Sequence, residues 1–258
     1  DICRARDGRL LYVAKRLPRA NDSPKWCSRL NPILESIMKD WSTWALDTEP
    51  KFVRELTGGL TNKSYLLQSG ERFLVLRINH PNSVDLDIDR HSELTIHRMA
   101  AAAKLSPAII YSAPDSRYWI RDFINGEALS DIQITAAHLD QMARLLNQLH
   151  RIPLTLNAPI ASLDISRKVN HYLQQATPSK EVRELKQILS VLIHSTLPRS
   201  DKETTSCLCH MDPLPANWIE APDGKLWLLD WEYSAWANPA LDYAALWLHI
   251  PKALRSHW

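Results

Sequence analysis

Apolar and polar residues alternate in the first part of the chain, whereas most of the second part follows a helical period. An amphipathic pattern predicts a helix at residues 31–46, and alternation between glycine-containing turns predicts strands at 51–57, 64–68 and 72–78. A longer helix is expected at 87–104, because aspartates stand at its start and a proline follows its end. The first part therefore predicts a small antiparallel sheet and one long helix.

The later part of the chain is mainly helical and contains a few short strands. Two more strands of the first part are expected at 108–112 and 118–123. Helical periodicity then predicts helices at residues 136–150, 165–175, 181–194 and 238–249. Short strands are expected around residue 208, at 218–219 and at 226–229, the last two flanking an Asp-Gly turn.

These patterns divide the chain into three parts. Residues 1–30 are basic and interrupted by prolines, so we expect an irregular extension. Residues 31–124 carry most of the strands and form a predicted first lobe, and residues 125–258 form a mainly helical second lobe. The prediction is an α+β protein with two lobes.

The composition is that of a folded globular protein, with 45% hydrophobic and 23% charged residues in a chain of 258. A net charge of +2 argues against binding to nucleic acid or to an anionic membrane surface. No apolar run reaches the length of a membrane-spanning helix, and the first residues lack the apolar core of a secretion signal. The four cysteines lack zinc-finger spacing and a disulfide framework, so we expect reduced thiols in a cytoplasmic protein.

Two short polar motifs lie close together late in the chain. An H-x-D-x-x-x-x-N segment contains Asp212 and Asn217, and a D-x-E segment at the end of an apolar run contains Asp230 and Glu232. A carboxylate on a rigid loop can orient a hydroxyl and accept its proton, so Asp212 is the candidate catalytic base. The other three side chains offer the oxygen ligands that Mg²⁺ prefers. Either motif alone could be a cap or a strand end, but their order and spacing favour a kinase that uses ATP and Mg²⁺.

A turn between two predicted strands contains Gly58, Gly59, Thr61 and Asn62. Paired glycines let backbone N–H groups approach phosphate oxygens closely, although such a pair is often only a hairpin turn. Its place between the first two strands makes this segment a candidate phosphate-binding loop.

A cation on the third strand and the lobe junction complete the predicted nucleotide site. Arg77 could bridge phosphates and pair with Glu93 of the following helix; alternatively, Arg77 is a plain strand charge and Glu93 pairs within its own helix. Backbone groups at Asp122, Phe123 and Ile124 lie where the chain passes between lobes, and we expect an adenine edge to bond there.

The chain contains ten tryptophans, five of which lie near the two motifs. Most are expected in the core. One or two of the five could instead offer a ring face to a cationic substrate: Trp218, Trp227, Trp231, Trp236 and Trp247.

Four of these segments together resemble the choline/ethanolamine kinase and aminoglycoside phosphotransferase superfamily. The similarity lies in the glycine turn at 58–63, the strand end at 75–78, the helix start at 90–93 and the D-x-E segment at 230–233. The last is most similar to the bacterial choline kinase and thiamine kinase-like branch. The resemblance implies a protein-kinase-like fold of two lobes, with nucleotide bound mainly by the first and a catalytic second lobe.

The resemblance also implies roles for single residues. Asp212 would be the catalytic base, Asn217 and Asp230 metal ligands, and Glu232 a second metal contact, while Asp242 would brace the catalytic loop. Members of the superfamily continue for several helices beyond this point, so we expect the carboxyl-terminal part of the acceptor pocket to be truncated here.

The function expected from the sequence is therefore the phosphorylation of a small alcohol that carries an amine, choline or ethanolamine first. A thiamine kinase or an aminoglycoside phosphotransferase shares the same motifs and remains an alternative. A kinase-like protein that binds without catalysis is a further alternative, which the short carboxyl end and the absence of a strand lysine favour.

Overall fold

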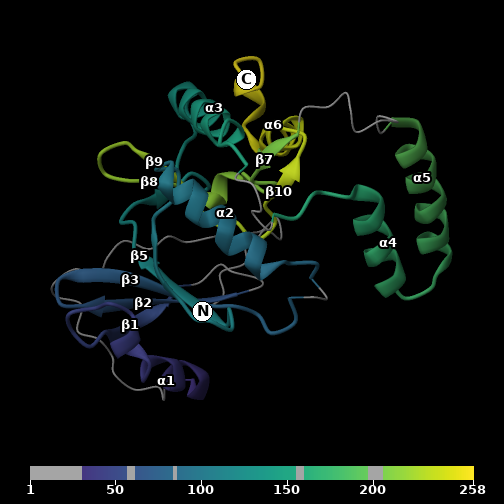
Figure 1. The fold of residues 1–258 in the computed structure, drawn as a ribbon. Helices are drawn as coiled ribbons and strands as arrows, with labels where there is room; N and C mark the ends of the chain where they lie inside the picture. Colours follow the sequence, from purple (N-terminus) through teal and green to yellow (C-terminus); the bar gives the residue numbers. More distant parts are fainter. Residues whose placement is uncertain (1–30, 57–61, 84–85, 155–159, 197–205) are drawn as a thin grey trace.

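A five-stranded antiparallel sheet forms one end of the molecule (Figure 1). The computed structural model describes residues 31–56, 62–83, 86–154, 160–196 and 206–258, so the predicted extension at 1–30 lies outside the described residues. The strand order is β1-β2-β3-β5-β4, which puts the strand of Arg77 in the middle. The strands are β1 (Lys51–Leu56), β2 (Lys63–Ser69), β3 (Arg72–Ile78), β4 (Ile109–Ser112) and β5 (Tyr118–Asp122).

The predicted helix at 31–46 is shorter in the structure, where α1 covers Pro32–Met38 and a 3₁₀ turn covers Trp41–Thr43. Thr43 donates both its backbone N–H (2.9 Å) and its hydroxyl (2.8 Å) to the carbonyl oxygen of Asp40, which tightens the turn. Trp44 is thereby fully buried against the sheet, and its indole N–H donates to the Tyr118 hydroxyl at 3.1 Å. The helix was predicted too long because the apolar spacing continues to residue 46, although the helix itself ends at Met38 and a hydrogen-bonded turn follows.

Helix α2 (Arg90–Ala102) crosses between the sheet and the rest of the molecule (Figure 1). It was predicted from residue 87 but begins at Arg90, because the Asp89 carboxylate caps it by accepting from the backbone N–H groups of His91 and Ser92. Its buried face includes Glu93, so the helix positions a carboxylate beneath the sheet.

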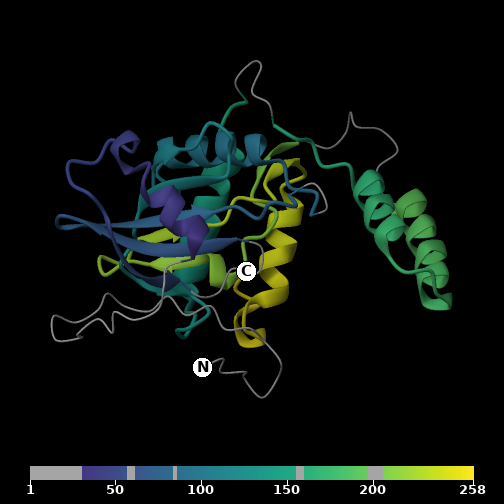
Figure 2. The same ribbon diagram turned by 90° about the horizontal axis from the view of Figure 1, so that it is seen from below.

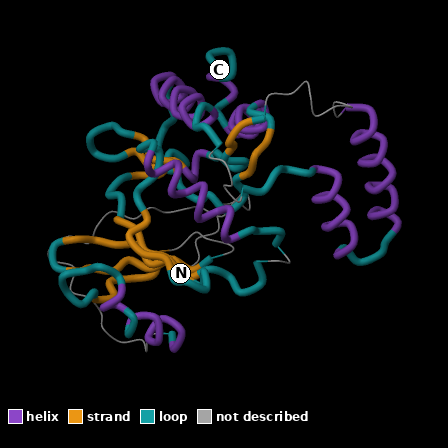
Figure 3. Tube along the Cα trace, in the orientation of Figure 1, coloured by secondary structure: helices purple, strands orange, loops and turns teal. Residues whose placement is uncertain are grey.

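The second lobe contains four helices and two small sheets in its described part (Figure 3). The helices are α3 (Ala136–His150), α4 (Ile165–Gln175), α5 (Lys180–Thr196) and α6 (Ala240–His249). The strands are β6 (Glu127–Ala128), β7 (Cys207–Cys209), β8 (Trp218–Glu220), β9 (Leu226–Leu228) and β10 (Ala235–Ala237). Strands β6 and β10 were not predicted, because each is defined by its pairing with a strand far away in the sequence, β8 and β7 respectively. The α4–α5 hairpin stands away from the remaining elements in two perpendicular views (Figures 1 and 2).

One core cluster joins α2 to the second lobe. It includes Ile96 of α2, Leu146 of α3 and Leu246 of α6, together with the fully buried rings of Trp218 and Trp231. Trp218 and Trp231, which lie near the predicted motifs, therefore serve packing, as large aromatic side chains commonly do.

Among the described residues, no helix has both the length and the apolar character that a membrane crossing requires.

Gly126 lies in the junction between the lobes, directly before β6. A Cβ atom there would overlap the backbone oxygen of Glu220 and lie 2.7 Å from Cγ2 of Ile219. We predict that Gly126→Ala lowers the free energy of unfolding by about 1–3 kcal/mol, because the added methyl group would push the junction away from β8. Urea denaturation measures this. Gly224→Asn is the control, since its surroundings are open and asparagine tolerates its positive φ; equal losses in both variants would contradict the explanation.

His97 of α2 is buried between the two lobes, where Nε2 lies 3.0 Å from the Pro107 carbonyl oxygen and from the Ser106 hydroxyl. Burial, aided by the charge of Arg121, lowers the pKa of His97 to about 3. The unfolded chain binds a proton there below about pH 6.5, whereas the folded protein does not until the pH falls much further. Stability should therefore fall as the pH drops through this window, by up to about 1.4 kcal/mol per pH unit.

This linkage is tested with His97→Gln. We expect the difference in unfolding free energy between about pH 7 and about pH 5.5 to shrink by about 1 kcal/mol in the variant. Urea titrations at both pH values measure it, with the surface substitution His257→Gln as control. An unchanged pH dependence in His97→Gln would show that other groups cause the acid sensitivity.

Candidate active site

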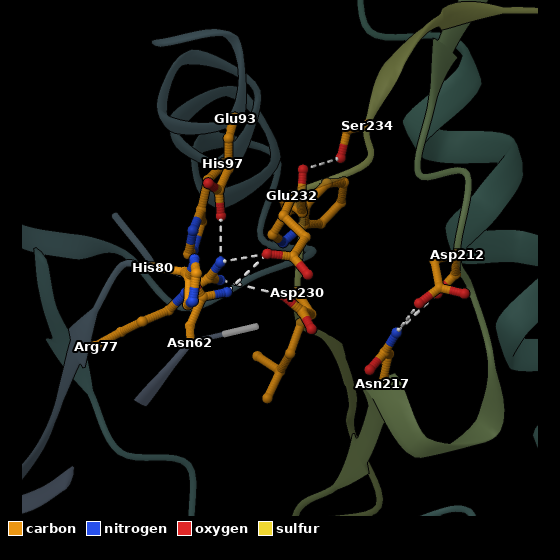
Figure 4. A network of polar contacts seen from close by, with 12 residues as sticks. Asn62, Arg77, His80, Glu93, His97, Asp212, Asn217, Asp230, Glu232 and Ser234 are labelled. Atoms are coloured by element: carbon orange, nitrogen blue, oxygen red, sulfur yellow. Dashed lines mark hydrogen bonds and ion pairs between the residues drawn. The ribbon is translucent and has the colours of Figure 1, made fainter. Parts of the chain in front are cut away.

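Arg77 connects the sheet to the D-x-E segment of the second lobe (Figure 4). Its guanidinium lies 2.9 Å from Glu93, 3.1 Å from Asp230 and 3.1 Å from Glu232, measured between nitrogen and carboxylate oxygen. The expected ion pair between Arg77 and Glu93 is therefore present, and both residues are buried. The guanidinium also stacks over the Trp119 ring, 5.2 Å from its centroid. Because its partners come from three elements, Arg77 fixes how the sheet, α2 and the second lobe meet.

A second arginine, Arg90, belongs to the same network, and its side chain is 9% exposed. It donates to Asn62 Oδ1 at 2.8 Å and to Glu93 Oε2 at 2.8 Å, and lies 3.4 Å from Glu232 Oε2. Asn62 in turn donates to Glu232 Oε2 at 2.7 Å. Asn62, the first described residue of the glycine turn, is thus tied to α2 and to the second lobe. Gly58, Gly59 and Thr61 of the predicted phosphate loop lie outside the described residues.

The charges of this network do not cancel. Two guanidinium groups face three carboxylates, Glu93, Asp230 and Glu232, which leaves one net negative charge when all are ionised. The Asp230 side chain is 27% exposed, whereas those of Glu93 and Glu232 are 4% and 5% exposed. Asp230 is therefore the carboxylate of the network that an added cation could reach most directly, and a hard divalent ion suits its oxygens.

Asp212 and Asn217 form the other half of the site (Figure 4). The Asn217 amide nitrogen donates to the Asp212 carbonyl oxygen at 2.8 Å and to its carboxylate at 3.0 Å. Asn217 ends a 3₁₀ turn, Pro215–Asn217, that returns the chain toward Asp212, and its side chain is buried. Since the amide nitrogen is committed to Asp212, the amide oxygen is the atom of Asn217 that could bind a metal.

The loop of Asp212 is held from behind by Asp242 of α6. This fully buried carboxylate accepts from the backbone N–H groups of His210 (2.9 Å) and Met211 (2.7 Å) and contacts His150 Nε2 at 2.9 Å. Met211 has a φ of 70° and Asp230 a φ of 67°, a region in which non-glycine residues store about 1–3 kcal/mol of strain. The two strained residues flank the site, and the surrounding hydrogen bonds keep them in place.

His210 joins the two motifs without being placed for proton transfer. Its Nδ1 accepts from the Asp212 backbone N–H at 3.3 Å, and its Nε2 lies 2.9 Å from the Leu229 carbonyl oxygen. Nε2 must therefore carry the hydrogen, so the ring is neutral. Burial lowers the pKa of His210, and its ring packs edge-on against Trp231 with centroids 4.6 Å apart. Sequence reasoning missed this bridge, because the carbonyl partner lies 19 residues away.

The three residues predicted to bind adenine, Asp122, Phe123 and Ile124, have different surroundings in the structure. Asp122 is half exposed and pairs with Arg72 at 2.8 Å, on the solvent side. The backbone N–H of Phe123 donates to the Phe73 carbonyl oxygen at 2.9 Å, and so continues the pairing of the sheet. Of the three predicted residues, Ile124 is the one beyond this pairing.

Arg121 adds positive charge beside Arg77 and was not among the predicted residues. Arg77 pairs with Trp119 and Val75 with Arg121 across β3 and β5, so both arginines lie on one face of the sheet. Burial and the nearby charge of Arg77 lower the pKa of Arg121 to about 10, which leaves it protonated at neutral pH. Two arginines on this face favour an anionic ligand such as a polyphosphate.

A two-lobed kinase-like fold, with a buried arginine facing paired carboxylates and an Asp–Asn loop, defines a phosphotransferase class of protein. The chain belongs to the phosphotransferase enzyme family, whose family profile matches residues 53–258. The resemblance inferred from the motifs is thereby confirmed.

The chain is also similar to individual kinases. It is 28% identical to a thiamine kinase of Escherichia coli O157:H7 over 208 residues, which cover 77% of this chain and 68% of the relative. It is 29% identical to protein LicA of Haemophilus influenzae over 193 residues, 73% of this chain and 56% of the relative. The chain thus spans about half to two thirds of the length of these relatives.

Solved structures show the same fold. Choline kinase LicA from Streptococcus pneumoniae has a TM-score of 0.71 at 20% identity, covering 88% of this chain and 80% of its own. A Plasmodium vivax ethanolamine kinase has a TM-score of 0.68 at 18% identity, covering 87% and 70%. These likenesses confirm the α+β, protein-kinase-like fold predicted from the sequence.

Proposed function

We propose that the protein transfers the γ-phosphoryl group of ATP to the hydroxyl of a small molecule, choline or ethanolamine first. The observation that carries this proposal is that the Asp212–Asn217 loop and the Arg77–Asp230–Glu232 network lie opposite one another at one site (Figure 4). Kinase catalysis requires a positioned proton acceptor, oxygen ligands for a metal and a cation for phosphates, and these residues supply all three.

In this proposal the chain positions the reactants. Asp212 orients the acceptor hydroxyl and takes its proton as the new O–P bond forms and the bond to ADP breaks. The oxygens of Asn217 and Asp230, with Glu232, would hold Mg²⁺, which neutralises charge on the phosphates when bound. Arg77, Asn62 and the glycine turn with Gly58, Gly59 and Thr61 would face the phosphates. Glu232 now accepts from three donors, so a metal role would require it to exchange partners.

The base would be held at the junction of the lobes. Ile124 follows the last sheet bond of this segment, so its backbone could pair with an adenine edge while Asp122 and Phe123 maintain the sheet. A small cationic alcohol as acceptor is supported by the similarity to choline and ethanolamine kinases. Thiamine is the second candidate, because the thiamine kinase match is as strong in identity as the LicA match.

The decisive experiment measures acceptor-dependent ADP release in the presence of Mg²⁺. Choline, ethanolamine, thiamine and an aminoglycoside are compared at equal concentration. We expect choline or ethanolamine to raise turnover most. Turnover that thiamine alone raises would select the second candidate, and no rise with any acceptor would contradict small-molecule kinase activity for this chain.

Nucleotide binding separates an enzyme from a non-catalytic relative. Mg²⁺-dependent ATP binding, followed by calorimetry, should be lost in Asp230→Ala and kept in Asp223→Asn, a control in an exposed turn. Equal binding by Asp230→Ala and the unsubstituted chain would favour a kinase-like protein that binds without this metal site.

Arg90 provides a test of the network itself. Arg90→Met removes the shorter of the two hydrogen bonds to Asn62 Oδ1 and leaves the one from the His80 backbone N–H, so we expect the KM for ATP to rise by about tenfold while kcat changes less. Steady-state kinetics at saturating acceptor measure both constants. Arg98→Met, on the same helix but with an exposed bond to Ser112, is the control. A fall in kcat with unchanged KM would contradict a role for Arg90 in ordering the phosphate loop.

A further inference from the structure

Three side chains of types that can bind metals lie close together beside the strand that leads into the catalytic loop. A ring nitrogen of His150 and the sulfurs of Cys207 and Cys209 all lie within 4.8 Å of one another. The two cysteines alternate along β7, so both point to the same face. Cys207 and Cys209 are buried, and the His150 side chain is 7% exposed. Two thiols and an imidazole gathered in the interior form a set of soft and borderline donors.

The spacing of these atoms fits a tetrahedral metal. A Zn–S bond of about 2.3 Å gives a distance of about 3.8 Å between two sulfurs on one tetrahedral ion. The Cys207 and Cys209 sulfurs are 3.7 Å apart. The nitrogen lies within 4.8 Å of both sulfurs, so it needs to approach by at most about 1 Å to reach a similar spacing. The sulfur pair is therefore already arranged as it would be on an ion.

A carboxylate supports the histidine of this cluster. His150 Nε2 lies 2.9 Å from Asp242 Oδ2. Histidines that bind metals commonly hydrogen-bond a carboxylate, which fixes the ring and raises its basicity. Asp242 also accepts from the backbone N–H groups of His210 and Met211. A shift of the His150 ring would therefore be passed through Asp242 to the loop that carries Asp212.

We propose that His150, Cys207 and Cys209 bind one thiophilic divalent ion of the Zn²⁺ or Cd²⁺ class, and that its binding alters the hold of Asp242 on the catalytic loop. Binding forms two metal–sulfur bonds and one metal–nitrogen bond and releases the two thiol protons to solvent. The site is distinct from the oxygen ligands proposed for Mg²⁺, because thiolates discriminate against that hard ion. A bound ion should change kcat through the loop that carries Asp212, and it should not compete with nucleotide for its site.

The thiols are otherwise inert. Burial raises the pKa of both cysteines, so each keeps its proton in the absence of metal. A disulfide would need an oxidant, and the sulfurs would have to approach from 3.7 Å to about 2.05 Å within one strand. Metal binding needs no co-reactant beyond the ion and keeps the sulfur spacing that the structure shows.

The site is tested by titrating Cd²⁺ into the protein and following the ultraviolet charge-transfer band of cadmium thiolates. Cys3→Ser/Cys27→Ser serves as the reference protein, because it leaves Cys207 and Cys209 as its two cysteines. We expect one equivalent of Cd²⁺ to produce the band in the reference. The band should lose at least half of its intensity when Cys207→Ser is added, because one of the two thiolates is removed, and His150→Gln should weaken Cd²⁺ binding by about 10- to 100-fold. His257→Gln on the surface is the matched histidine control.

A second readout tests the link to the loop. Amide exchange at His210 and Met211 should change on Cd²⁺ binding to the reference and stay unchanged in Cys207→Ser. Absence of a stoichiometric band in the reference, or a band of undiminished intensity in Cys207→Ser, would overturn the site. Unchanged exchange despite a normal band would overturn its coupling to the loop. If Cys207→Ser fails to fold by circular dichroism, His150→Gln alone decides, and unweakened Cd²⁺ binding there overturns the proposal.

Discussion

Asp212→Asn is expected to lower kcat by about 10²- to 10⁴-fold, the usual contribution of a positioned proton acceptor. The amide retains the shape of the carboxylate but cannot take the hydroxyl proton. Asn217 already holds this side chain at 3.0 Å, so the substitution should leave the loop in place. ATP binding should stay within about twofold, because Asp212 is separated from the Arg77 network (Figure 4).

Steady-state kinetics with the best acceptor and calorimetry with ATP separate these two effects. Asp223→Asn is the matched control, since it is the same change in an exposed turn of the same lobe. A kcat within tenfold of the unsubstituted chain would show that Asp212 is not the proton acceptor. A large loss of ATP affinity would instead indicate that the loop had moved.

Asp242→Asn should produce the largest loss of stability, about 3–5 kcal/mol, as when one partner of a buried charged network is removed. The carboxylate accepts from two backbone N–H groups and faces His150, with no exposure to solvent. An amide must turn its NH₂ group toward at least one of these donors, or leave one unpaired. The melting temperature should fall by on the order of 10 °C.

Denaturant titration and a thermal melt measure this loss. Asp140→Asn is the control, because Asp140 is 56% exposed and pairs with His257 at 3.1 Å. Its effect should stay within about 0.5 kcal/mol. If both variants unfold alike, the loop does not depend on the buried carboxylate for its stability.

The long helices of the second lobe could be predicted from the sequence, whereas the end of the first helix and two of the short strands could not. The pattern matched α3 and α4 to the residue, because each has an apolar stripe and clear ends. The first helix was predicted too long, since hydrogen bonds from Thr43 to Asp40 end it within an unbroken apolar pattern. Strands β6 and β10 depend on partners across the second lobe, and no local pattern encodes them.

The same distinction holds for the candidate site. Asp212 and Asn217 are five residues apart, and their spacing within one loop made the pair visible. The Arg77–Glu93 pair was predictable because a strand and the next helix must pack together. Arg90 was missed, since its bond to Asn62 crosses 28 positions and its contact with Glu232 crosses 142. Such contacts follow from the assembled fold rather than from local spacing.

Arg77 has three acidic partners, and this sharing has a thermodynamic consequence. An anion that binds the Arg77 guanidinium would weaken its bonds to Asp230 and Glu232, which lie 3.1 Å away. Those carboxylates would then be freer to bind a cation. A cation on Asp230 would equally release the guanidinium for an anion. Because such linkage is reciprocal, the two ligands should bind with positive cooperativity, each raising the affinity of the other by the same factor.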